Sequence, residues 1–227
     1  MSRAENRVET TRTIQATARR HLADVGPAAL SLRAIAREVG MVSSAVYRYF
    51  PSRDELLTAL IVEAYDELGE AVEQAEAGVR RRADLGGRFL AVCDAIHDWA
   101  RANPHEYALL YGSPVPGYVA PDTTVTSAGR ISGAFLRLAQ ESEAAGDELA
   151  PTRSASPEER RALDGVRPAL EIPVADDRMV RWLMAWSTVF GHTSLELFGH
   201  MHRGILDYDA HFRQVTTQLA ADLGLTG

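Results

Sequence analysis

The residues best suited to binding a polyanion lie in one short stretch, VSSAVYRYF, at residues 42–50. Hydroxyl, phenol and guanidinium groups crowd into it, and it holds no acid that would repel phosphate. Val46 and Phe50 are four residues apart, which predicts that both lie on the buried face of a helix. The side chains left outside such a helix are Ser43, Ser44, Ala45, Tyr47, Arg48 and Tyr49. We expect these groups to face DNA, with the two phenols reaching phosphates.

A second pattern has the spacing of a metal site. His192, Glu196 and His200 recur every four residues, so on one continuous helix they would share a face and could bind zinc. The same stretch carries small residues that let another helix approach closely, namely Ala185, Ser187, Gly191, Ser194 and Gly199. We therefore interpret the three side chains as a polar stripe between two copies of the chain, in which Glu196 pairs with a histidine of either copy. A zinc-responsive regulator is the alternative, and no bound metal is predicted.

The sequence gives little support for an enzymatic function. It contains no G-x-S-x-G, no glycine-rich phosphate loop and no H-E-x-x-H. The lone cysteine, Cys93, falls within an apolar helical pattern and is interpreted as a small core residue. The sequence therefore predicts neither an enzymatic activity nor a cofactor.

Three short helices must position the polar stretch. The first ends at Gly26-Pro27, the second starts after the expected N-cap Ser31 and stops at Gly40, and Pro51 ends the third. Short helices joined by tight turns follow the helix-turn-helix plan, in which the second helix of the pair enters the major groove. No sustained period-2 alternation follows, so the whole chain is predicted to be all-α.

The charge is divided unevenly along the chain. Residues 1–53 hold nine arginines and four acids, a net of +5, whereas residues 54–227 hold fifteen arginines and twenty-seven acids, a net of −12. This division predicts a DNA-binding domain at 1–53 and an acidic domain at 54–227 that does not meet a polyanion. A non-specific DNA-architectural protein, the other class considered, would be basic throughout. There is no secretory signal and no apolar run of membrane-spanning length, so we expect a cytoplasmic protein without a membrane partner.

Aromatic residues of the second domain are candidates for a ligand pocket, because such sites combine apolar walls with a few polar groups. They cluster around residues 97–118 and 182–192. The candidates are Trp99, Tyr107, Tyr111, Tyr118, Trp182, Trp186 and Phe190. They predict a small hydrophobic or aromatic ligand, and an aromatic core is the other interpretation.

The stretch LSLRAIAREVGMVSSAVYRYFPSRDELL resembles the DNA-binding head of TetR-type transcriptional regulators, over about residues 10–60. The resemblance implies an all-helical homodimer in which residues 54–227 of each subunit form a ligand-binding and dimerisation domain behind the head. It further implies a repressor that binds a palindromic double-stranded operator and is released by its ligand.

Site residues follow from the same resemblance. It implies that Ser31 and Arg53 contact phosphate and that Arg33 contacts phosphate or a base edge. Ser43, Ser44 and Ala45 match its base-reading positions, and Tyr47 and Tyr49 match positions that bond the DNA backbone. Val42 stands where many members have serine or threonine, so Ser43 is the predicted N-cap. Guanine contacts by Arg33 or Arg48 and a thymine-methyl contact by Ala45 are the expected sources of specificity.

Overall fold

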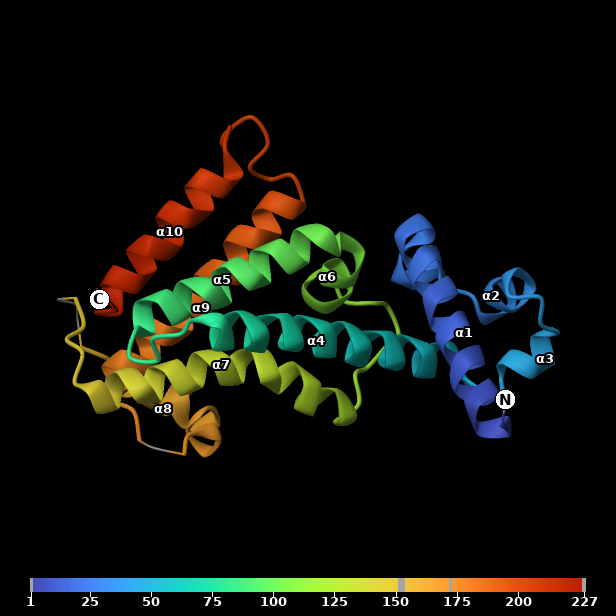
Figure 1. Cartoon of the computed structure of the whole chain (residues 1–227), viewed down its shortest axis with the longest axis horizontal. Coiled ribbons are helices and arrows are strands. Elements are labelled where there is room, and N and C mark those ends of the chain that lie inside the picture. The colour runs from blue at the N-terminus through green and yellow to red at the C-terminus, as the bar shows by residue number, and fades with distance from the viewer. Residues whose placement is uncertain (1, 151–153, 172, 226–227) are drawn as a thin grey trace. The chain divides into compact units, whose positions relative to one another are not determined.

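A computed structural model of the chain describes residues 2–150, 154–171 and 173–225, and of Arg3 the backbone only. Within those ranges it holds helices and turns without a strand, which confirms the predicted all-α class (Figure 1). The α-helices are α1 (Arg3–Val25), α2 (Leu32–Glu38), α3 (Ser43–Val46), α4 (Arg53–Gly78), α5 (Leu85–Ala102), α6 (Pro104–Tyr111), α7 (Thr123–Ala145), α8 (Pro157–Ala162), α9 (Asp176–Leu197) and α10 (Tyr208–Asp222). Single 3-10 turns are η1 (Pro27–Ala29), η2 (Leu163–Gly165) and η3 (Arg167–Ala169).

The chain divides into two compact units. The first, called the head below, comprises the residues up to Glu67 together with Asn103–Ala128. The second, called the body, comprises Leu68–Ala102 together with Gly129–Gly227. Helices α4 and α7 each contribute residues to both units. The division after residue 53 stays a prediction, because compactness alone does not say which residues bind DNA.

The head is built on one apolar cluster to which all of its first four helices contribute. Buried members are Ile14 and Ala18 of α1, Leu32, Ile35 and Ala36 of α2, Val46 of α3, Phe50 after α3, and Leu56, Leu57 and Leu60 of α4. The inward orientation predicted for Val46 and Phe50 is therefore confirmed. Gly26 and Gly40 have φ of +73° and +69°, the left-handed conformation that glycine adopts most cheaply, so they end α1 and α2 as predicted.

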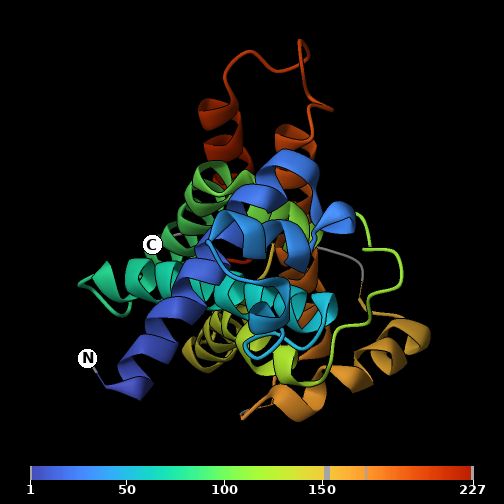
Figure 2. The same cartoon turned by 90° about the vertical axis from the view of Figure 1, so that its right-hand side faces the viewer.

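Aromatic and ionic contacts organise the core of the body. The Phe89, Phe135 and Trp182 rings of α5, α7 and α9 pack edge to face, with centroids 5.7–6.4 Å apart. Arg88 is also buried, and its guanidinium Nη2 donates to Glu76 Oε1 at 2.6 Å and to Glu141 Oε1 at 2.7 Å. After α9 the chain reverses and α10 packs on α9 and α5 (Figures 1 and 2). In the described ranges no helix is both long and apolar enough to cross a membrane.

Candidate functional site

Helix α3 begins one residue earlier than predicted. Its N-cap is Val42, in extended backbone with φ −67° and ψ 141°, and the Val42 carbonyl accepts from Ala45 N–H at 2.8 Å. Ser43 is thus the first helical residue, and the prediction that Ser43 is the cap is wrong. The reason is that valine adopts extended backbone readily, so the helix starts there without a side-chain cap.

The exposed side chains of residues 42–50 are three with polar ends and one apolar side chain. Ser44, Tyr47 and Arg48 are exposed, with Tyr47 at 41%, whereas Ser43, Ala45 and Tyr49 are half-buried. Val42 is 72% exposed, an apolar side chain that sequence reasoning missed as a candidate contact. The sequence did indicate it, because Val42 stands directly before the helix, where a branched apolar side chain can contact a thymine methyl group.

An arginine of α1 supports the turn that follows α3. The Arg7 guanidinium carbon lies 5.3 Å from the Tyr49 ring centroid, and Arg7 Nη2 donates to the Arg48 carbonyl at 3.2 Å. Tyr49 also packs against the apolar cluster of the head. Tyr49 is therefore held in place on two sides, and Arg7 joins the candidate interface as a residue that only its long-range contact reveals.

Helix α2 matches its prediction at the start. Ser31 is its N-cap, and the hydroxyl accepts from Ala34 N–H at 3.4 Å, while Arg33 is exposed. The one acid of α2, Glu38, accepts from Arg20 at 2.8 Å and contacts His21 at 2.6 Å. Hydrogen bonds from these two residues lower the pKa of the Glu38 carboxyl. The Glu38 carboxylate is thus paired with two other residues of the head.

Arg53 has a structural task that the sequence did not indicate. Its Nη2 donates to the Pro27 carbonyl at 2.7 Å and to the Ala28 carbonyl at 3.3 Å. These bonds tie the start of α4 to η1, the turn after α1. The phosphate contact implied for Arg53 remains a prediction, and it would have to share the guanidinium with two carbonyls.

The aromatic candidates for a ligand pocket are distributed over both units. In the head, the Tyr107 and Tyr111 rings lie 5.1 Å apart, and Tyr65 meets Tyr111 edge to face at 6.2 Å. Burial raises the pKa of the Tyr111 phenol. The Tyr118 hydroxyl hydrogen-bonds Thr58 at 2.9 Å and its ring packs on the head cluster. These tyrosines have packing roles in the head.

The other four candidates lie in the body. Trp99 and Phe190 are buried, and the Phe190 ring lies 5.2 Å from that of Trp186. Trp182 and Trp186 line a cavity of about 260 Å³ between α7, η3 and α9. The structure thus brings two of the seven candidates to one cavity.

The predicted histidine–glutamate stripe is wrong in its last member. Helix α9 ends at Leu197, and Gly199 adopts φ +78°, so His200 lies exposed in a turn away from the helix face. Glu196 pairs with His97 of α5 in the same chain, at 2.7 Å, rather than needing a second copy. Among the described residues, no three His, Cys, Asp or Glu side chains are grouped so as to hold a metal ion.

His192 is buried in an unusual setting. Its ring lies 5.1 Å from that of His211 and 5.3 Å from that of Phe212. Neither ring nitrogen has a hydrogen-bond partner in the part of the chain that the structure describes. Burial, with the neighbouring His211 as a smaller cause, lowers the pKa of the His192 imidazole. This histidine is therefore a neutral core residue near pH 7.

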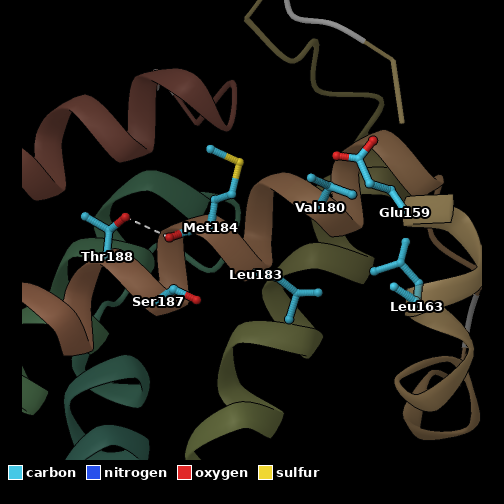
Figure 3. Close-up of a pocket in the computed structure, with 8 residues that line it drawn as sticks. Glu159, Leu163, Val180, Leu183, Met184, Ser187 and Thr188 are labelled. Atoms are coloured by element: carbon cyan, nitrogen blue, oxygen red, sulfur yellow. Dashed lines mark hydrogen bonds between the residues drawn. The ribbon is translucent and has the colours of Figure 1, made fainter. Parts of the chain in front are cut away.

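One face of α9 carries an exposed stripe. Its members are Met184, Thr188, Gly191, Leu195 and Phe198, the cap residue after the helix. Met184 is 57% exposed and Leu195 45%. The spacing alternates four and three residues, which is the repeat of a helix that packs along another helix. Met184 and Thr188 also line a shallow groove between α8, η2 and α9, together with Val180 and Leu183 (Figure 3).

Comparisons with known proteins agree with this arrangement. Residues 14–60 match the family model for bacterial regulatory proteins of the tetR family, and residues 89–219 match the model for the tetracyclin repressor-like C-terminal domain. An HTH-type transcriptional regulator of Mycobacterium tuberculosis strain H37Rv is 42% identical over 214 residues, which cover 89% of this chain and 88% of the relative.

Solved structures give the same result. The crystal structure of the regulatory protein SCO4313 is 30% identical, with a TM-score of 0.80 over 96% of this chain and 98% of that one. A tetR family transcription regulator from Shewanella sp. PV-4, 22% identical, shares the fold with a TM-score of 0.61 over 92% and 94% of the two chains.

Proposed function

Because the chain belongs to the TetR family of transcriptional regulators, which are non-enzymatic DNA-binding proteins, we propose that it is a ligand-released repressor. It binds a palindromic operator as a homodimer, and it acts in the cytoplasm, where the DNA is. The observation that carries this proposal is the exposure of Ser44, Tyr47 and Arg48 on a segment, residues 42–50, that contains no acid. A surface of donors without acids suits phosphate and base edges together.

The proposed contacts fall into two groups. Ser31, Tyr47, Tyr49 and Arg53 contact phosphates, and they fix the register of the head on the duplex without reading sequence. The groups that read base edges are Arg33, Ser43, Ser44, Ala45 and Arg48. Val42 adds an apolar contact to this second group, since it is 72% exposed in the free chain. Substitutions in the first group should weaken binding to all DNA, whereas those in the second should change sequence preference.

The homodimer is proposed to form through the exposed stripe of α9. Five positions at alternating spacings of four and three, two of them glycine or threonine, allow a second helix to approach closely along the stripe. A two-fold axis at α9 makes the interface isologous, with the same patch on both copies. Such a dimer must present its two α3 segments about 34–36 Å apart, or at a multiple of this distance, to reach successive major grooves.

Release by ligand is proposed to act through α4. This helix contributes Arg53–Glu67 to the head and Leu68–Gly78 to the body. A ligand that binds the body and shifts α4 changes the spacing of the two heads, and the dimer then loses one of its half-sites. The ligand can do so only by binding the released state more tightly than the DNA-bound state.

The test is footprinting of the purified protein on the intergenic DNA beside its own gene, with sedimentation to give the oligomeric state. A protected palindrome and a dimer are expected. Uniform, salt-sensitive coating of all DNA would contradict the proposal and indicate an architectural protein instead. The S44A/R48A double variant is the matched control. It removes two of the proposed base contacts, and because both positions are exposed, the core of the head stays intact.

A further inference from the structure

The cavity between α7, η3 and α9 has walls that define a class of ligand. Its volume of about 260 Å³ lies just below the range of roughly 300–1,000 Å³ usual for ligand sites, so its occupant is small. Three of its walls are aromatic, from Phe135, Trp182 and Trp186. Phe135 and Trp182 meet edge to face at 6.4 Å, so a ring that entered the cavity would meet aromatic walls.

The lining carries no formal charge. None of the side chains around this cavity is an arginine, histidine, aspartate or glutamate. A carboxylate or an ammonium ion would lose its hydration there without gaining an opposite charge, which is strongly unfavourable. The cavity therefore selects a neutral molecule.

Hydrogen-bonding groups of the lining are weighted toward donors. Indole N–H groups donate only, whereas the Ser132 hydroxyl already donates to the Gly129 carbonyl at 3.3 Å and can still accept. Trp182 Nε1 is buried and has no acceptor in the part of the chain that the structure describes. Buried donors are nearly always paired in folded proteins. An acceptor carried by a ligand would satisfy this one.

Access to the Trp182 N–H requires a neighbouring side chain to move, because Nε1 is covered from solvent. Met179 lines the same cavity and has three rotatable bonds, so it can supply that freedom. The outer wall is firmer. It includes Ala169 of η3, a turn that Arg167 ties to Asp176 Oδ1 at 2.7 Å and to Asp164 Oδ1 at 3.2 Å.

We propose that this cavity binds a small neutral molecule made of one aromatic ring and one carbonyl or ether oxygen, with the oxygen accepting from Trp182 Nε1. This assignment deepens the proposed ligand-released repressor, and it rests on that function only for the effect of binding on DNA. The ring packs against Phe135 and Trp186, and the entrance lies beside Ala169.

Four probes with the same benzene ring test the chemistry by titration calorimetry. Acetophenone offers a neutral acceptor, ethylbenzene has none, benzoate is an anion and benzyltrimethylammonium is a cation. Saturable binding of one acetophenone per chain is expected, with ethylbenzene about tenfold weaker and no binding of the two ions. Equal or tighter binding of benzoate overturns the proposal, as does the absence of saturable acetophenone binding up to its solubility limit.

Two variants locate the site. Ala169→Trp fills the entrance from an exposed position and should abolish acetophenone binding, whereas Ala162→Trp, also exposed but lining the neighbouring groove, which shares only Leu183 with the cavity, should keep it. Trp182→Phe keeps a ring and removes the donor, so acetophenone should bind about tenfold more weakly while ethylbenzene is unchanged. Trp99→Phe is its control, because Trp99 does not line the cavity. Wild-type acetophenone affinity in Ala169→Trp overturns the site.

Operator affinity is measured separately with the same probes. If acetophenone binds the cavity and DNA binding is unchanged, the cavity assignment stands and the release mechanism fails at this site. If another compound releases the operator equally well from Ala169→Trp, the repressor function stands and the cavity is not its switch. The two proposals can therefore fail independently.

Discussion

The head and the body treat polar side chains in opposite ways. Among the described residues, the buried polar side chains of the head are hydroxyls, those of Thr17, Thr124 and Ser127. The body also buries hydroxyls, but it adds charged or titratable groups, namely Glu76, Arg88, His97, Arg178, His192 and Glu196. The head thus has an apolar core in which no charged side chain of the described residues is buried. The body buries charged and titratable groups, so each of them depends on particular neighbouring residues for its pairing.

This contrast predicts different costs for damage to each unit. Apolar clusters lose stability by cavity formation, whereas buried polar groups make stability depend on protonation and pairing. Four substitutions or conditions separate these responses, from the largest expected effect to the smallest.

Breaking the dimer should have the largest effect on function. Leu195→Asp places a charge in the exposed stripe of α9, so the protein should sediment as a monomer. Operator affinity should then fall by about 100-fold or more, because the second half-site is no longer held nearby. Val119→Asp adds the same charge at a side chain that is 86% exposed in the head and should leave both properties unchanged. A persistent dimer in Leu195→Asp would show that α9 is not the interface.

Damage to the head cluster should come next. Leu57 is fully buried, and Leu57→Ala should destabilise the head by about 2–5 kcal/mol through the cavity it leaves. Urea unfolding followed by circular dichroism measures the loss, and a gel shift should show weakened DNA binding. Leu206→Ala, at a side chain 94% exposed, should change unfolding by less than about 0.5 kcal/mol. Equal losses of unfolding free energy in Leu57→Ala and Leu206→Ala would contradict the difference in packing between the two positions.

Removing one surface donor should have a smaller effect. Tyr47→Phe should weaken binding by about 1 kcal/mol, the usual net value of one hydrogen bond, on operator and random DNA alike. Fluorescence anisotropy on both duplexes measures this, and Tyr208→Phe in the body is the control. A loss confined to the operator would mean that Tyr47 reads a base rather than a phosphate.

Acid should act on the body before the head. The pKa of His192 is lowered by burial, chiefly, and by His211 and His97, while Glu196 opposes the shift. The unfolded chain therefore binds a proton more readily, so this stability is complete above about pH 6.5 and declines as the pH falls below it. The pKa of Glu38 in the head is also lowered, so its contribution is lost only as the pH falls below about 4.5.

Melting curves from pH 7.5 to pH 4 measure the difference. His192→Phe should flatten the fall between pH 6.5 and pH 5.5, while Glu38→Gln should leave that interval unchanged. If His192→Phe melts with the wild-type pH dependence, the histidine does not titrate on unfolding.

Much of the head could be predicted because its determinants are local. Ser31 caps α2 from three residues away, Gly26 and Gly40 end helices by their own backbone conformation, and Val46 and Phe50 are one turn apart. The start of α3 was misplaced by one residue because an extended valine can begin a helix without a cap. The turn at Gly199 was also readable, and it should have excluded His200 from α9.

The remaining contacts could not be predicted because they join distant segments. Arg53 reaches the Pro27 carbonyl, and Glu196 meets His97 from ninety-nine positions away. Spacing along one helix says nothing about which helix lies opposite. For the same reason the sequence could not show that, of the seven aromatic candidates, Trp182 and Trp186 line one cavity of the body.

The head is discontinuous in the sequence, and this affects how such a protein can be recombined. Leu56, Leu57 and Leu60 complete the cluster that α1–α3 begin, and Leu109, Val115 and Tyr118 return to the same cluster after the chain has left for α5. A single recombination crossover after residue 53 would transfer the DNA-binding segment without these packing partners. Exchange of a whole head needs two crossovers, one after Glu67 and one bringing Asn103–Ala128. New operator preferences should therefore arise more readily by point substitution on the surface of α3 than by shuffling of modules.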